Sequence, residues 1–144
     1  MDHVAIMKKS WGLTEKILSG QKKIESRWYK TKHAPWGKIA KGDTVYFKDS
    51  GEPVTIKASV KKVVQFKNLT SYKIKEILKE FGKDDGIDKK DSQKYFEMFK
   101  DKKYCLLIYL EKISSIKPFE INKKGFGAMA AWISIQDIRI LIKE

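Results

Sequence analysis

The 144-residue chain has few residues of several types, and each shortage excludes a class of protein. Its one cysteine, Cys105, excludes a disulfide framework and a zinc site built from several cysteines. Its two histidines, His3 and His33, have no carboxylate pair at ligand spacing, and no phosphate-binding glycine motif is present, so we expect neither metal nor cofactor. No apolar run approaches the length of a membrane span and the N-terminus has no signal pattern, so we expect a cytoplasmic protein without membrane contacts.

Arginine is the most informative shortage. The chain has 31 lysines and arginines, and only Arg27 and Arg139 are arginine. In a chain that uses lysine almost everywhere, an arginine suggests a need for a planar donor that forms two hydrogen bonds at once. The alternative for Arg27 is an ordinary exposed ion pair on an edge strand. So few arginines also weaken the case for base-specific recognition of a duplex.

The charge balance is strongly positive, with a formal net charge of +13 and a pI of about 9.7. A basic protein of this size is attracted to polyanions, of which nucleic acid is the commonest in the cytoplasm. Lysine is spread along the whole chain, so a general lysine bias would give the same count. With 42% hydrophobic residues, the chain can bury one core, and we expect a single domain over residues 1–144.

Hydrophobic periodicity and turn residues predict mainly strands with helices inserted between them. The expected strands are 3–7, 23–28, 44–48, 54–66, 104–113 (continuing past Pro118) and a weak 138–142, and residues 128–135 fit either state. Within 54–66 the alternation slips at Lys61–Lys62, which predicts a β-bulge. The expected helices are 10–19, begun by Ser10 and ended by Gly20, then one that begins at Thr70 or Ser71 and runs to Phe81, and 92–99. Residues 83–88 are expected to form a plain polar turn. This order favours an α+β fold built on a small mixed barrel.

One short segment carries most of the chemistry: Gly20-Gln21-Lys22-Lys23-Ile24-Glu25-Ser26-Arg27. Side chains alternate across a strand, so Glu25 and Arg27 share a side while Ile24 faces the core. In a cleft, a partly desolvated Lys22 beside Glu25 could act as a base or orient water. On an open surface the same residues would form a weak salt bridge. Cys105, within an apolar strand, is expected to be an inert buried thiol.

Four tryptophans are many for a domain of this size: Trp11, Trp28, Trp36 and Trp132. Trp28 and Trp36 lie in basic sequence, and aromatic rings among cations suit the stacking of unpaired bases. The alternative is that several of them fill the core. We expect Trp132 to be core, Trp11 to lie in the core or at a cleft floor, and Trp36 to be the most exposed.

The spacing Gly20-x-Lys22-x-x-Glu25-x-Arg27 resembles the signature of the ASCH domain, within the PUA-like superfamily. The stretch 41–47 also resembles the family's x-G-D-x-V strand start. The resemblance implies a PUA-like mixed β-barrel surrounded by α-helices, with an RNA-binding cleft beside the barrel. The cleft residues it implies are Lys22, Glu25 and Arg27, with Ser10, Trp11, Lys48 and Ser50 nearby; the tryptophan pattern adds Trp36.

Some proteins that the chain resembles are enzymes. One branch removes the acetyl group from N4-acetylcytidine, with a lysine at the position matching Lys22, a threonine at that matching Glu25 and a later glutamate. Here Glu25 replaces the threonine, and residues 64–68 after the long strand offer no glutamate. Other relatives are ribonucleases, but no residue set here specifies one.

The leading hypothesis is therefore a non-catalytic module that binds RNA or a nucleotide and acts in RNA metabolism or translation. The alternative is a small hydrolase acting on a modified nucleoside or RNA, with Lys22 and Glu25 as the catalytic pair. A third is a protein-interaction domain. The sequence predicts no base preference and no oligomeric state.

Overall fold

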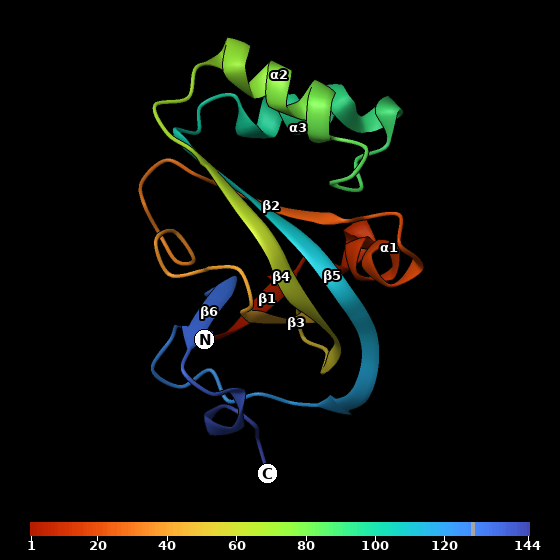
Figure 1. Cartoon of the computed structure of the whole chain (residues 1–144), viewed down its shortest axis with the longest axis vertical. Coiled ribbons are helices and arrows are strands. Elements are labelled where there is room, and N and C mark those ends of the chain that lie inside the picture. Colours follow the sequence, from red (N-terminus) through yellow and green to blue (C-terminus); the bar gives the residue numbers. More distant parts are fainter. Residues whose placement is uncertain (128) are drawn as a thin grey trace.

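The computed structural model describes residues 1–127 and 129–144, and its centre is one six-stranded sheet. The strands are β1 (Asp2–Met7), β2 (Ile24–Tyr29), β3 (Thr44–Asp49), β4 (Val54–Phe66), β5 (Tyr104–Phe119) and β6 (Trp132–Ile135), in the order β2-β5-β4-β3-β1-β6. Only β1 and β3 pair in parallel; the other neighbours are antiparallel. The sheet curls into a half-barrel (Figure 1). The predicted α+β fold is confirmed, but the barrel is open between its edge strands β2 and β6.

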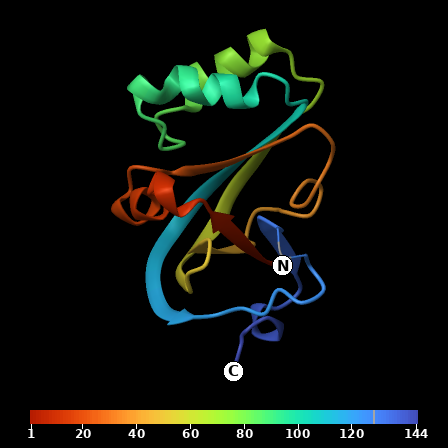
Figure 2. The same cartoon turned by 180° about the vertical axis from the view of Figure 1, so that it is seen from behind.

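Three helices surround the sheet: α1 (Leu13–Ser19), α2 (Ser71–Phe81) and α3 (Ser92–Phe99). Helices α2 and α3 lie together across one end of the sheet, and α1 lies at its side (Figures 1 and 2). Thr70 caps α2 by accepting a hydrogen bond from the Lys73 backbone, as its sequence predicts, and Gly20 ends α1 with a φ of 86°. Among the described residues, no helix is long and apolar enough to cross a membrane.

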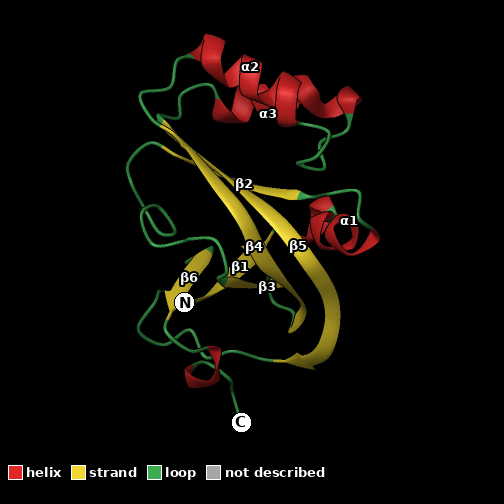
Figure 3. Ribbon diagram, viewed as in Figure 1, coloured by secondary structure: helices red, strands yellow, loops and turns green. Residues whose placement is uncertain are grey.

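Strands β4 and β5 form the spine of the fold and run from the helical layer to the opposite end of the molecule (Figure 3). Their register shifts between Val60 and Lys62, which confirms the predicted bulge. Strand β5 is apolar on both faces, because Leu106 and Ile108 fill the half-barrel while Cys105 and Leu107 pack toward α2. Cys105 is fully buried, and burial raises the pKa of its thiol, which fits an inert core residue.

Two local predictions are wrong. Ser10 does not cap α1: it lies exposed in a short 3₁₀ turn, Lys9–Trp11, and Gly12 stands between that turn and the helix. Residues 138–142 do not form a strand, since Ile138–Ile140 is a 3₁₀ turn and only Ile142 bridges back to Ile121. Of the ambiguous stretch 128–135, the last four residues form β6, while residue 128 lies outside the described residues.

Candidate functional site

The turn between α1 and β2 is tied to a distant loop, residues 82–88, that follows α2. The backbone N–H groups of Lys23 and Ile24 both donate to the Asp84 carbonyl, at 2.6 and 2.9 Å. From α1, Lys16 Nζ donates to the Gly86 carbonyl at 2.8 Å. These bonds hold the loop against the Gly20 to Arg27 motif. They also direct the side chain of Asp85, the residue after Asp84, toward Lys22.

Lys22 is almost fully buried, with 2% of its surface exposed. Its ammonium has three close acceptors: the Asp85 carbonyl at 2.6 Å, Asp85 Oδ1 at 2.7 Å and Glu25 Oε1 at 3.2 Å. A lysine ammonium has three N–H donors and no acceptor. All three donors of Lys22 therefore have partners within the protein.

Arg27 stands on the same side of β2 as Glu25, as predicted. Its Nη2 and Nε lie 2.8 and 3.2 Å from Glu25 Oε2. The guanidinium also donates to the Ala131 carbonyl at 3.2 Å and lies 5.0 Å from the centre of the Trp132 ring. Trp132 belongs to β6, so Arg27 connects β2 and β6, the two edge strands, which are not paired with each other in the sheet.

Opposite charges balance in this ion cluster, made of Lys22, Glu25, Arg27 and Asp85. Burial acts to lower the pKa of Lys22, but the carboxylates of Asp85 and Glu25 outweigh it and hold that pKa above its ordinary value. Burial acts to raise the pKa of Glu25, but Lys22 and Arg27 hold it below its usual range. Burial raises the pKa of Asp85, with Lys22 opposing the rise. The cluster has two cationic side chains and two carboxyl groups, so its formal charges cancel.

A hollow of about 400 Å³, the edge cleft, opens over this cluster. The five consecutive residues 25–29 of β2 line it, so it follows the unpaired edge of that strand. Its other walls come from the end of β1, the 3₁₀ turn Lys9–Trp11, the start of α1, the loop 82–88, α3 and the loop before β6. They include Trp11, Tyr95 and Phe99, with Lys8 and Lys102 also present. The rings of Trp11 and Tyr95 meet edge to face, with centroids 5.5 Å apart.

The structure brings together some of the predicted site residues and separates others. Lys22, Glu25, Arg27 and Trp11 all line the edge cleft. Ser10, Trp36, Lys48 and Ser50 are not among its described lining residues. Trp36 is half-buried against the Tyr104 ring, as Trp11 is half-buried in the cleft, and both are more exposed than the buried Trp28 and Trp132. Lys48 is buried in β3, and Ser50 lies exposed at the following turn. Trp28 is buried and stacks on Phe99, and Trp132 is core as predicted.

Asp85 is the site residue that sequence reasoning missed. Residues 83–88 do form a turn, but Asp85 is 5% exposed within it and contacts both Lys22 and the Ser26 hydroxyl. Gly86 allows this approach: its φ is 80°, and a Cβ there would lie 3.0–3.2 Å from three side-chain carbons of Lys22. The sequence feature that could have pointed to Asp85 is the Asp85-Gly86 pair in a polar loop.

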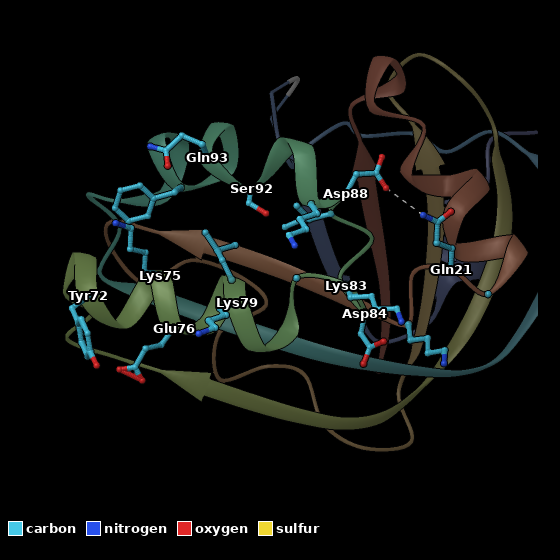
Figure 4. Close-up of a pocket in the computed structure, with 17 residues that line it drawn as sticks. Gln21, Tyr72, Lys75, Glu76, Lys79, Lys83, Asp84, Asp88, Ser92 and Gln93 are labelled. Carbon is cyan, nitrogen blue, oxygen red and sulfur yellow. Dashed lines mark hydrogen bonds between the residues drawn. The ribbon is translucent and has the colours of Figure 1, made fainter.

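A second and larger hollow, the helix groove, lies between α2 and α3 (Figure 4). It measures about 1020 Å³, and Ile87 lines both it and the edge cleft. The loop 82–88 thus forms a wall between the two hollows. Within the described part of the chain, no group of three or more histidine, cysteine, aspartate or glutamate side chains is arranged to hold a metal ion.

Comparison with solved structures relates this whole architecture to known folds. The crystal structure of ASCH from Zymomonas mobilis superposes with a TM-score of 0.66 at 14% identity, covering 99% of this chain and 96% of that one. A mutant form of that protein gives 0.67 at 15% identity, covering 99% of both chains. The N-terminal domain of Staphylothermus marinus McrB gives 0.60 at 13% identity, covering 96% of this chain and 90% of the other.

Sequence comparison adds no closer relationship: no family model and no curated protein matches the chain. The likeness in structure, over nearly the full length, confirms the fold that the Gly20 to Arg27 signature predicted. The chain has the fold of the ASCH crystal structures, a half-barrel accompanied by helices.

Proposed function

We propose that the chain is a binding module that holds one nucleotide of an RNA strand in the edge cleft. The observation that carries this proposal is the charge-balanced ion cluster beneath an aromatic wall. A neutral, polar floor suits a nucleobase better than a phosphate. Alternate residues of β2 also direct backbone N–H and C=O groups away from β5, and these can bond the edge of a base.

The phosphates of the bound strand are assigned to the lysines around the cleft rather than to Lys22. All three donors of Lys22 are occupied, whereas Lys8 is exposed and Lys102 is half-buried beside the cleft. Trp11 supplies a face on which a base can stack, with the Lys8 ammonium 5.1 Å from its ring centre. The ASCH-like fold and the net charge of +13 support the same partner.

A matched pair of tryptophan variants tests this proposal. Trp11→Leu should weaken binding of a four-nucleotide RNA by about tenfold, because one stacked base is lost. Trp36→Leu removes a ring that is also half-buried but lies outside the cleft, and it should leave the affinity within about twofold. Binding is measured by fluorescence anisotropy of the labelled RNA at low salt. Equal losses in the two variants, or no RNA binding by the unaltered chain, would exclude the edge cleft as a nucleotide site.

A hydrolase acting on a modified nucleoside is the second candidate, and Asp85 is the observation that favours it. The deacetylating enzymes that the chain resembles combine the motif lysine with a glutamate later in the chain, and residues 64–68 contain no glutamate. Asp85 instead places a carboxyl group beside Lys22. Against this role, the raised pKa of Lys22 and its three occupied donors make it a poor base.

Incubation with N4-acetylcytidine separates the two functions. A hydrolase adds water across the amide and releases cytidine and acetate, which chromatography resolves. We expect no release above the buffer blank. Turnover that is lost in Asp85→Asn and retained in Asp84→Asn, its neighbour on the other side of the loop, would establish the hydrolase instead.

A further inference from the structure

The residues that line the helix groove extend along α2 and the loop that follows it (Figure 4). Tyr72 lies at one end and Gln21 near the other, where its amide donates to Asp88 (Figure 4). The α2 wall is the longer one, and 11 helical residues extend about 16 Å. Ile87 is shared with the edge cleft, so a chain leaving the cleft past the 82–88 loop would enter the groove.

Lysines follow the groove at regular spacing. Lys75, Lys79 and Lys83 succeed one another every four residues along α2 and its end, at a rise of about 6 Å per step. Lys23 and Lys89 line the groove from the α1–β2 turn and the turn before α3. In the described structure, none of these five lysines forms an ion pair, in contrast to Lys22.

The remaining lining adds carboxyl groups, apolar side chains and aromatic rings. Three carboxyl groups line the groove with the five lysines: Glu76, Asp84 and Asp88. Asp88 is already engaged by Lys16 at 3.4 Å and by Gln21 at 3.5 Å. Phe96 lies in the groove with the Lys75 ammonium 5.1 Å from its ring centre, and Tyr72 is 73% exposed. Cations beside aromatic faces are the combination that binds single-stranded nucleic acid.

We propose that the helix groove binds the sugar–phosphate backbone of single-stranded RNA next to the nucleotide held in the edge cleft. This inference rests on the proposed function and extends the binding site from one nucleotide to several. The lysines spaced by helical turns contact successive phosphates, and Tyr72 stacks on a base at the far end. Affinity therefore depends on the length of the RNA, not only on the base in the cleft.

The dependence on length provides the test. Anisotropy titrations compare a four-nucleotide with a twelve-nucleotide uridine RNA, and the longer RNA should bind at least tenfold more tightly. The double variant Lys75→Gln/Lys79→Gln should lose about tenfold in affinity for the longer RNA and keep that for the shorter one. Its slope of log affinity against log salt concentration should be less steep by about 1.4, because two phosphate contacts are lost.

A matched control uses two exposed lysines of β4, in Lys57→Gln/Lys61→Gln, which change the net charge equally outside the groove. Equal effects of the two double variants would overturn the inference, since they would reflect net charge alone. The inference would also be overturned if a glutamate oligomer of equal charge competed with the long RNA as effectively as unlabelled RNA does, because the groove would then favour acidic peptides. If the short RNA binds and the long RNA binds no more tightly, the helix groove is excluded as a binding site while the edge cleft is retained. If neither RNA binds, the proposed function itself is excluded.

Discussion

The edge cleft and the helix groove share two stretches of chain, the start of the motif and the loop 82–88, yet these stretches carry charge differently in the two hollows. Lys22 and Asp85 turn into the cleft, where they are buried and paired. Their neighbours Lys23 and Asp84 line the groove, where both are exposed. Adjacent lysines thus serve different purposes: one holds a loop in place through a fixed ion pair, and the other contributes to the field that attracts anions. A net charge of +13 hides this division.

The largest expected effect comes from changing the two adjacent lysines in turn. Lys22→Met should lower the free energy of unfolding by about 3–5 kcal/mol, because Glu25 and Asp85 lose their shared ammonium while buried. Lys23→Met should change it by less than about 0.5 kcal/mol, since its side chain is exposed. Urea denaturation followed by tryptophan fluorescence measures both. Similar changes in the free energy of unfolding for the two variants would mean that Lys22 is not a buried, paired lysine in contrast to the exposed Lys23.

A smaller effect is expected from crowding Lys22 through the loop. Gly86→Ala should cost about 2–4 kcal/mol, because alanine is strained at a φ of 80° and its Cβ would press on the Lys22 side chain. Gly51→Ala is the control: its φ is 81°, but nothing lies within 4 Å of the added Cβ. The control should cost only about 1–2 kcal/mol. The difference between the two variants isolates the packing of the loop against the lysine.

The smallest effect is a pH dependence that belongs to the cleft. At pH 7, Glu25→Gln should lower the free energy of unfolding by about 2 kcal/mol, because Lys22 and Arg27 lose a buried counter-charge. The folded-state pKa of Glu25 is lowered, so its stabilisation is present above the ordinary value of 4.5 and is lost as the pH falls through the folded-state pKa.

The gap between Glu25→Gln and the unaltered chain should therefore narrow in denaturation series taken from pH 7 to pH 3. Glu76→Gln, which removes an exposed carboxyl group of the groove, should stay within about 0.5 kcal/mol of the unaltered chain at pH 7. A gap for Glu25→Gln that stays constant down to pH 3 would contradict the paired state of this carboxylate.

Local sequence signals predicted most of the fold. The ends of β4, α2 and α3 match the expected ranges, because each has strong periodicity bounded by turn residues or a cap such as Thr70. Ser10 misled the prediction, since Gly12 takes the position from which a cap would act. The open barrel could not be predicted, because closure depends on how edge strands far apart in sequence meet.

The candidate site was predictable only where its residues are local. Lys22, Glu25 and Arg27 lie within one turn and strand, so alternation placed the last two on one side. Asp85 comes from a loop 63 residues after Lys22, and its inward position depends on the backbone bonds at Asp84. Lys48 lies in β3 and Ser50 just after it, and β5 and β4 separate that strand from β2 in the sheet, so neither residue lines the cleft as the resemblance implied.

The solitary thiol of Cys105 has a practical consequence. It is fully enclosed at the junction of β2, β5 and β4, opposite Trp28 and Phe66. An alkylating reagent can reach it only when these strands separate, so the rate of thiol labelling in native buffer reports how often β5 separates from its neighbours. The chain thus contains its own reporter, which can follow disruption of the strands beside the site without any engineered cysteine.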